Sequence, residues 1–212
     1  MPRGRSGCAL VALAILSLGS TSDARSVGGQ RTSVPDMIVI HTIGGPRCNK
    51  GVIVFDPIRD RKDDATFRKK QLESNSAASI HFVVGRDGTV ANSVPEMQVA
   101  SHAAGVNDRA IGIELVNRGD GKELFSDDQL AALDKLVQEI RGRYPIPLEN
   151  IVGHQDVDQR TCTCGGGIFR RRVDPNIKFS IEDLRKAVGR PGEVVGKEIR
   201  YKPLVGASGV HC

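Results

Sequence analysis

Four short apolar runs, separated along the chain, constrain the fold of this sequence more than any other feature. Runs of this length that are rich in Ile and Val are typical of buried strands. The second run is followed by turn residues at 86–88 and then by Thr89 and Val90, so it begins a hairpin. The four runs lie at residues 37–41, 80–84, 110–116 and 151–152.

The clearest helix lies between the third and fourth of these runs. It begins at Ser126, where Ser126 and Gln129 match a capping box. Further helices are expected at about 66–77 and from Ser180 to about 189. Strands that alternate with helices predict an α/β fold, a three-layer single domain whose central, mostly buried, mixed β-sheet is flanked by helices. The apolar stripe of the main helix consists of Leu130, Leu133, Leu136, Val137 and Ile140.

The boundaries of this domain follow from length and composition. A chain of 212 residues favours one domain, which we place at residues 37–189. Residues 25–36 are polar and contain Gly and Ser, so a flexible N-terminal segment is expected there. Residues 190–212 are expected to form a C-terminal tail.

Residues 1–24 match a secretory signal peptide. Arg3 and Arg5 precede an apolar run at 8–18, and small residues precede a cleavage site predicted after Ala24. The run is well short of the roughly 20 residues that a membrane-spanning helix needs. The mature protein is therefore expected to be exported, periplasmic or secreted, without a membrane span.

Export changes the interpretation of the cysteines, because an oxidising compartment favours disulfide bonds. A bond between Cys162 and Cys164 would close a very tight ring, so we expect them to have separate partners, Cys48 and Cys212. The sequence leaves open which cysteine pairs with which. The rival interpretation, a metal site at the Cys-Thr-Cys motif, is disfavoured because two-residue spacers are commoner in zinc knuckles.

Two histidines occupy equivalent places, since His41 and His154 each follow an apolar run. Each would be delivered by the end of a strand, where sheets open into clefts. Asp174 lies further along the segment 153–175, which has no amphipathic period and is not expected to form an ordinary helix or strand. Two His and one carboxylate match a catalytic zinc site with water in the fourth position. The alternative is that each His is a hydrogen-bonded core residue.

Together these segments resemble the type 2 N-acetylmuramoyl-L-alanine amidases, the zinc amidases related to bacteriophage T7 lysozyme and to peptidoglycan recognition proteins. The resemblance covers roughly residues 37–188 and defines 37–189 as a zinc amidase domain. It implies hydrolysis of the amide bond between N-acetylmuramic acid and L-alanine in peptidoglycan or its fragments. The matching motifs are IVIHT at 38–42, SIHFVV at 79–84, RDGT at 86–89, VPE at 94–96, ASHA at 100–103, IGIELVN at 111–117, IVGHQD at 151–156 and RVDP at 172–175.

The resemblance also implies roles for individual residues. His41, His154 and Asp174 align with the Zn²⁺ ligands of the family. Glu114 aligns with the catalytic acidic residue that handles the protons of the attacking water. Arg172 aligns with a position that is usually Lys and that carries positive charge toward the oxyanion. Unlike Lys, Arg does not readily give up a proton, so a further role of that Lys would be lost here.

Two further histidines and one insertion belong to the same comparison. His102 matches a histidine of the substrate-side loop and His81 one on a central strand, and both are expected to shape or support the cleft. The segment 161–169 lengthens the loop between His154 and Asp174. A disulfide bond from Cys48 to this segment would hold two ligand-bearing loops together.

The functional alternatives are a non-catalytic peptidoglycan-binding module and a zinc peptidase acting on stem peptides. The filled ligand positions favour catalysis over binding alone. A zinc peptidase would use the same metal ligands, so only identification of the products distinguishes it from an amidase. The formal net charge of +5 suits an anionic cell wall, and an aromatic content of 4% gives little support to nucleic-acid binding. We expect a monomer whose partner is peptidoglycan or muropeptides, and intact wall, soluble fragments and anhydro-muropeptides are equally compatible with the sequence.

Overall fold

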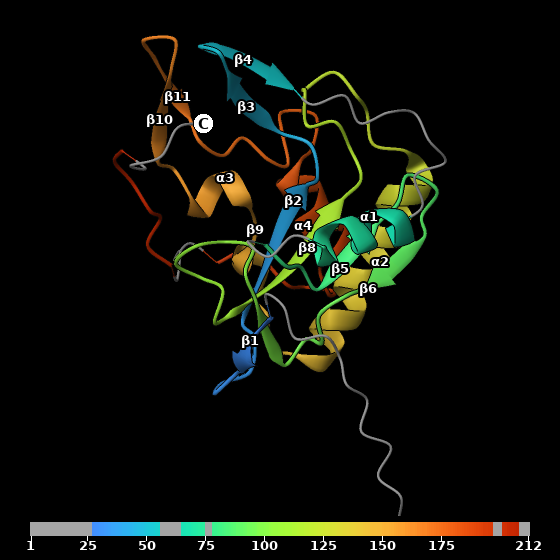
Figure 1. The fold of residues 1–212 in the computed structure, drawn as a ribbon. Helices are drawn as coiled ribbons and strands as arrows, with labels where there is room; N and C mark the ends of the chain where they lie inside the picture. The colour runs from blue at the N-terminus through green and yellow to red at the C-terminus, as the bar shows by residue number, and fades with distance from the viewer. Residues whose placement is uncertain (1–26, 56–64, 75–77, 197–200, 208–212) are drawn as a thin grey trace, which may run out of the picture.

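The architecture was obtained as a computed structural model, and it describes residues 27–55, 65–74, 78–196 and 201–207. Its centre is a five-stranded mixed sheet with the order β6-β5-β8-β2-β9 (Figure 1). The strands β9, β2, β8 and β5 run parallel, and β6 is antiparallel to β5. Their bounds are Met37–Thr42 for β2, Phe82–Val84 for β5, Val90–Asn92 for β6, Ala110–Leu115 for β8 and Ile151–Gly153 for β9.

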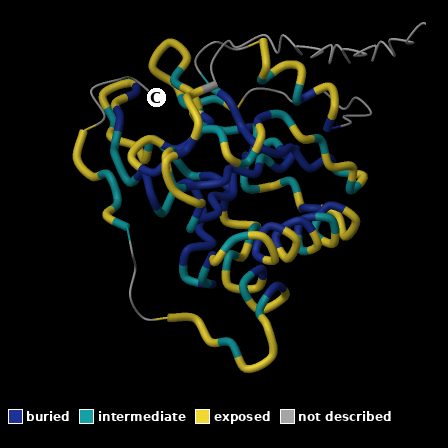
Figure 2. Tube along the Cα trace, turned by 90° about the horizontal axis from the view of Figure 1, so that it is seen from below, coloured by how far each residue is buried: buried dark blue, intermediate teal, exposed yellow. Residues whose placement is uncertain are grey.

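Helices cover both faces of this sheet, as the predicted three-layer α/β domain requires. Ile38 and Ile40 of β2 point to the face covered by α2 (Asp127–Arg143) and α4 (Ile181–Val188). Val39, between them, points to the other face, which carries α1 (Ala65–Glu73) and α3 (His154–Val157). The strands are buried from both sides, whereas the helices expose their outer faces (Figure 2).

The main helix begins where the sequence predicts, but its second capping residue has another role. Ser126 accepts a hydrogen bond from the N–H of Gln129, which confirms the first half of the capping box. The side chain of Gln129 does not return to Ser126. It is buried and donates to the carbonyls of Val84 and Val116, so it ties α2 to the ends of two central strands.

The N-terminal segment differs from the flexible stretch expected at 25–36. Strand β1 (Val27–Gln30) pairs antiparallel with β7 (Gln98–Ala100). The next residue, Arg31, is buried and donates hydrogen bonds to three backbone carbonyls. A polar composition does not exclude order here, because backbone pairing and one buried guanidinium anchor the segment. The expected signal peptide lies outside the described residues.

The segment 153–175 is more regular than the sequence suggests. It contains the single turn of α3 and a hairpin formed by β10 (Thr161–Cys164) and β11 (Gly167–Arg170). Regular structure arises without amphipathic periodicity because the hairpin lies at the surface, and Gly165 and Gly166 supply the positive φ angles of its turn. The described part of the C-terminal tail runs alongside, since Leu204 exchanges backbone hydrogen bonds with Val157 and Gln159.

A disulfide bond joins this hairpin to a second one, formed by β3 (Pro46–Asn49) and β4 (Val52–Phe55). It links Cys48 to Cys164, so the loop after β2 and the loop after β9 are connected as expected. Cys162 is disulfide-bonded as well, which removes the Cys-Thr-Cys metal site. Cys212 lies outside the described residues, and its pairing with Cys162 stays a prediction.

One expected helix is shorter in its described part, and one short helix was not expected. Helix α1 ends at Glu73, and residues 75–77 of the expected helix lie outside the described part. A short 3₁₀ helix, Leu148–Asn150, precedes β9. Among the described residues, no helix combines the length and apolar character that crossing a bilayer requires.

The start of α4 offers a local test of the fold. The hydroxyl of Ser180 accepts a hydrogen bond from the N–H of Asp183 at 3.0 Å, and replacing such an N-cap by Ala costs about 1 kcal/mol. We therefore expect Ser180→Ala to lower the free energy of unfolding by about that amount, measured by urea denaturation. Ser180→Asp keeps an acceptor and should stay close to the parent protein. Equal losses in both variants would show that the cap does not stabilise α4.

Candidate metal centre

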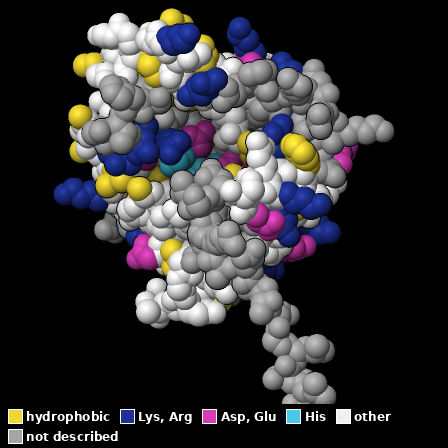
Figure 3. Space-filling model, in the orientation of Figure 1, with side chains coloured by type: hydrophobic (Ala, Val, Ile, Leu, Met, Phe, Trp, Pro, Cys, Tyr) yellow, Lys and Arg dark blue, Asp and Glu magenta, His cyan; other side chains and the backbone are white. Residues whose placement is uncertain are grey.

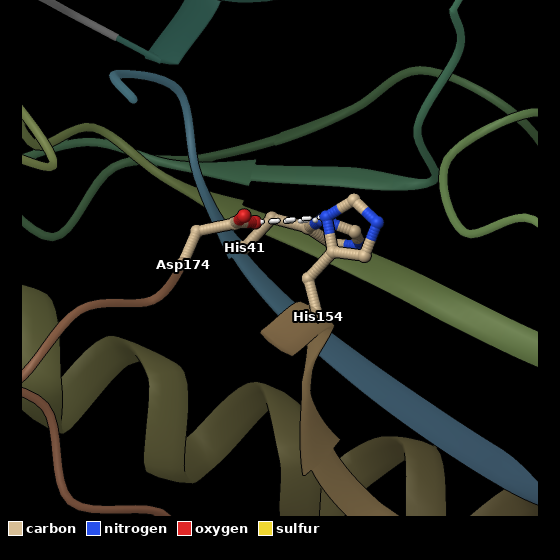
Figure 4. Close-up of side chains that lie close together, drawn as sticks. All are labelled: His41, His154 and Asp174. Carbon is tan, nitrogen blue, oxygen red and sulfur yellow. Dashed lines mark hydrogen bonds and ion pairs between the residues drawn. The ribbon is translucent and has the colours of Figure 1, made fainter. Parts of the chain in front are cut away.

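Three side chains from separate segments meet at the carboxyl end of the central strands (Figure 4). Ile40 of β2 pairs with Gly153 of β9, so the next residues, His41 and His154, leave the sheet side by side. Asp174 arrives from the loop after β11, held by a hydrogen bond from the N–H of Gln155 to its carbonyl at 2.9 Å. The sequence prediction that these three residues converge is therefore met by the geometry.

The three potential ligand atoms form a nearly equilateral triangle. His41 Nδ1 lies 3.0 Å from His154 Nδ1 and 3.2 Å from Asp174 Oδ2, and His154 Nδ1 lies 3.0 Å from the same oxygen. All three residues are buried. While Asp174 is ionised, no placement of protons on the two imidazoles makes all three contacts attractive, because either two N–H groups or two lone pairs must face each other. A cation at the centre would attract all three atoms at once.

These distances and atom types fit a zinc ion. Ligand atoms about 2.0–2.1 Å from a tetrahedral zinc lie about 3.3 Å from one another, close to the separations observed here. Two imidazoles with one carboxylate leave a fourth position for solvent or substrate. Within the described part of the chain, His41, His154 and Asp174 form the one cluster of three or more such side chains that could hold a metal ion.

The protonation states of His41 and Asp174 suit cation binding. Burial, together with the neighbouring His154, lowers the pKa of His41 to about 4, so its imidazole is neutral at pH 7. Burial by itself raises the pKa of Asp174, but the adjacent His154 and His41 outweigh burial and hold that pKa well below its usual range. Neither His41 nor Asp174 therefore has to lose a proton to the solvent before it binds a cation.

Glu114 lies next to His41 on the sheet. The two residues are paired directly between β8 and β2, so their side chains emerge on the same face. Burial, and secondarily Asp174, raises the pKa of Glu114 to about 8, while Arg172 opposes this shift. Oε2 of Glu114 and Nε of Arg172 are both buried without a hydrogen-bond partner. Two unpartnered polar atoms beside the triangle are available to a substrate or water.

Gly112 lies two residues before Glu114 in β8, so it lies on the same face of the sheet. The space beside Gly112 is filled by Ile80 and His102, because a Cβ on Gly112 would lie 2.5 Å from Ile80 Cδ1 and 2.7 Å from the His102 ring. His102 Nδ1 lies 3.0 Å from His41 Nε2, on the side of the His41 ring opposite to the triangle. Burial, and then His41, holds the pKa of His102 well below its ordinary value.

His81 supports the sheet and does not reach the triangle. Its Nδ1 accepts a hydrogen bond from the N–H of Gly112 at 3.0 Å, and its Nε2 lies 3.1 Å from the carbonyl of Gln98 and 3.0 Å from Nη2 of Arg31. Burial lowers its pKa to about 4. Arg31 was missed by the sequence analysis, since nothing in its polar surroundings signals a buried role.

The triangle lies at the floor of a hollow with a volume of about 840 Å³ (Figure 3). Glu114, His102 and Arg172 also line it, so every sequence-predicted site residue except His81 borders this space. Buried Asp158, a second residue that the sequence analysis missed, pairs with two of the arginines at the rim. The arginines that line the hollow are Arg47, Arg68, Arg160, Arg171 and Arg172.

The known sequences that this chain resembles include N-acetylmuramoyl-L-alanine amidases and phage endolysins. The sequence model of a family described as N-acetylmuramoyl-L-alanine amidase matches residues 30–167. The endolysin of Enterobacteria phage K11 is 35% identical over 86 residues, which are 39% of this chain and 56% of that protein. The 1,6-anhydro-N-acetylmuramyl-L-alanine amidase AmpD of Enterobacter cloacae is 32% identical over 145 residues, 64% of this chain and 76% of that protein. The chain thus spans about half the length of the phage endolysin that it matches.

Solved structures show the same fold at lower identity. The N-acetylmuramyl-L-alanine amidase AmiD from E. coli, in complex with anhydro-N-acetylmuramic acid-L-Ala-D-gamma-Glu-L-Lys, superposes with a TM-score of 0.52 and 24% identity. The match covers 76% of this chain and 65% of that chain. A selenomethionine derivative of AmpD gives a TM-score of 0.55 at 21% identity, covering 77% of this chain and 90% of that chain.

The raised pKa of Glu114 predicts a specific pH dependence of stability. The unfolded carboxyl ionises near 4.5 and the folded one near 8, so the folded state holds one more proton between these values. Stability is then greatest below the lower value and falls as the pH rises, by up to about 1.4 kcal/mol per pH unit. Glu114→Gln removes this titration. In metal-free protein, its stability advantage over the wild type should therefore grow by about 1 kcal/mol or more between about pH 5 and pH 8.

The measurement is denaturant unfolding in the presence of a chelator. Glu139→Gln, which changes an exposed carboxylate on α2, should run parallel to the wild type at all pH values. Parallel curves for Glu114→Gln and the wild type would show that burial does not perturb Glu114.

Proposed function

Because the chain belongs to the N-acetylmuramoyl-L-alanine amidase family, we propose that it is a zinc-dependent hydrolase of the amide bond between N-acetylmuramic acid and L-alanine. Its substrate is peptidoglycan or muropeptides released from it. The observation that carries this proposal is the triangle of His41 Nδ1, His154 Nδ1 and Asp174 Oδ2, with Glu114 beside it. The same fold in a relative solved with an anhydromuramyl peptide supports a substrate of this kind.

His41, His154 and Asp174 are the residues that would hold the metal. Zinc, when bound, supplies Lewis acidity toward the scissile carbonyl and the attacking water. The three residues would contribute two imidazole nitrogens and one carboxylate oxygen, which would leave a single net positive charge on the centre. These side chains lie at the floor of the hollow, so they would hold that charge where a bound substrate can reach it.

Glu114 is proposed as the residue that moves protons. A carboxyl group whose pKa is about 8 lies close enough to neutrality to accept and release a proton within one turnover. It takes a proton from water as the oxygen attacks the carbonyl carbon, and it delivers that proton to the amine nitrogen as the C–N bond breaks. General acid–base catalysis of this kind contributes about 10²–10⁴ in rate.

Arg172 is proposed to stabilise the negative charge that develops on the carbonyl oxygen. Its guanidinium keeps its charge at any working pH, and its buried Nε has a proton without an acceptor. An N–H group directed at the developing oxyanion in a water-poor site typically contributes about 10²–10³ in rate. The charge of Arg172 also opposes the burial that raises the pKa of Glu114, so the two residues are coupled electrostatically.

We also propose that residues 1–24 act as a signal peptide cleaved after Ala24 and that the mature domain works in the periplasm or outside the cell. The disulfide bond between Cys48 and Cys164 supports this proposal, because such bonds persist in oxidising compartments. Peptidoglycan is located there as well. The mature domain is proposed to act as a monomer.

The first prediction concerns the bond that is cut. Mass spectrometry of peptidoglycan and anhydro-muropeptides digested by the zinc-loaded protein should show free stem peptides that begin with L-Ala. Glu114→Gln should lower kcat by at least about 10²-fold, and a chelator should abolish the activity. Glu139→Gln, an exposed carboxylate on α2, is the matched control and should be fully active.

The alternatives give different results in the same experiment. Fragments cut within the stem peptide would identify a peptidase. Binding to peptidoglycan without any cleavage would identify a binding module. Full activity of Glu114→Gln, with the expected products, would remove Glu114 from the mechanism and leave the metal centre in place.

The second prediction concerns Arg172. Arg172→Met should lower kcat by about 10²-fold with little change in KM, because the oxyanion forms only as the reaction proceeds. Arg172→Lys should retain most of the activity if charge alone is needed. Lys178→Met, which removes an exposed charge from the same loop region, serves as the control. An unaltered kcat in Arg172→Met would exclude the oxyanion role.

A further inference from the structure

We infer that His102 is a positioning residue that holds His41 in the ring tautomer whose Nδ1 lone pair faces the metal centre. This inference rests on the proposed metal site, but it concerns only the hydrogen bonds of the protein itself. The sequence analysis gives His102 a place in the substrate-side loop, whereas the structure places its ring directly behind a ligand, 3.0 Å from His41 Nε2.

The backbone carbonyl of Ala110 sets the direction of the hydrogen bonds that connect Ala110, His102 and His41. His102 Nε2 lies 3.3 Å from the carbonyl oxygen of Ala110, which can only accept. His102 therefore carries its proton on Nε2, and its Nδ1 is an acceptor. The facing atom, His41 Nε2, must then be the donor. A neutral His41 with a proton on Nε2 has its lone pair on Nδ1, which is the atom in the triangle.

The other tautomer of His41, with its proton on Nδ1, makes an unfavourable contact either between His41 and His102 or between His102 and Ala110. A proton on His41 Nδ1 would leave its Nε2 as a lone pair facing His102. His102 would then need its own proton on Nδ1, and its Nε2 lone pair would face the carbonyl oxygen of Ala110. That contact is repulsive, and a buried acceptor without a donor costs about 1–3 kcal/mol. Asp174 Oδ2, 3.2 Å from His41 Nδ1, favours a proton on that nitrogen. The contacts from Ala110 through His102 oppose this and favour the tautomer of His41 whose Nδ1 lone pair is free for a cation.

Several contacts keep the ring of His102 in place. The side-chain oxygen of Asn107 accepts hydrogen bonds from the N–H groups of His102 and Ala103, at 3.0 and 2.7 Å. The absence of a side chain on Gly112 leaves room for the ring. On the far side, Arg31 donates to the same carbonyl of Ala110 at 2.6 Å. A continuous path of hydrogen bonds thus runs from Arg31 through Ala110 and His102 to His41.

This arrangement should raise metal affinity. The second nitrogen of a metal-binding histidine usually donates to an acceptor that fixes the ring, and loss of that acceptor typically weakens metal binding about 10–100-fold. Here the acceptor is another imidazole, whose own proton is secured by a backbone carbonyl. An imidazole that is already oriented loses less freedom when it binds a metal ion.

Two variants of His102 separate this role from simple packing. Asn has an oxygen attached to Cγ, near the position of His Nδ1, so His102→Asn keeps an acceptor for His41. Leu fills a similar volume and offers none. Zinc affinity of the mature chain, measured by competition with a chelating dye, should fall about 10–100-fold in His102→Leu and stay within about threefold of the wild type in His102→Asn. If His102 only filled space, His102→Leu should bind zinc at least as well as His102→Asn. Equal zinc affinities of His102→Leu and the wild type would overturn the inference.

A measurement on the wild type avoids variants that fail to fold. Nitrogen-15 NMR of the imidazoles in metal-free protein at neutral pH should show protonated Nε2 and unprotonated Nδ1 for both His41 and His102. A protonated Nδ1 on His41 would overturn the inference. Neither readout requires turnover, so a protein that fails to cleave peptidoglycan but shows these tautomers and affinities would refute the proposed activity and leave the role of His102 standing.

Discussion

The parallel pairing of β2 with β8 and β9 is the constraint on which the rest of the structure depends. It places His41 beside Glu114 on one side and beside His154 on the other. The side-chain period of a strand is two residues, so a slip of one position would turn His41 toward α2 and α4. Such a slip is opposed by the burial of residues 37–40, whose alternating side chains pack into separate cores on the two faces.

The third potential ligand depends on a different kind of interaction. Asp174 lies in irregular backbone and is placed by the close approach of its loop to β9. A side chain on Gly153 would collide with Pro175, so the glycine that precedes His154 also admits the segment that carries Asp174. The Cys48–Cys164 bond, formed between the loops after β2 and β9, adds a covalent limit to their separation. Strand pairing, a close glycine contact and a disulfide bond thus act together on one site.

The site concentrates titratable groups that a folded protein normally keeps in water. A neutral His41, an ionised Asp174 and a Glu114 with a raised pKa lie within one hollow. Burial disfavours the charged form of each group, and at Asp174 the two adjacent histidines outweigh burial. Groups whose pKa values are pushed apart in this way are typical of acid–base chemistry.

The sequence by itself determined the strands of the central sheet, the starts of α2 and α4 and the identity of the three convergent side chains, because these depend on local periodicity, capping and motif order. It failed where order comes from distant partners. The local sequence of residues 27–31 indicates flexibility, but pairing with β7 and three backbone carbonyls that accept from Arg31 order this segment. The local sequence of Gln129 indicates a capping residue, but its side chain donates to the carbonyls of Val84 and Val116. The link from His102 to His41 was decided only by the tertiary structure, since a hydrogen bond between residues from separate elements has no signature in either local sequence.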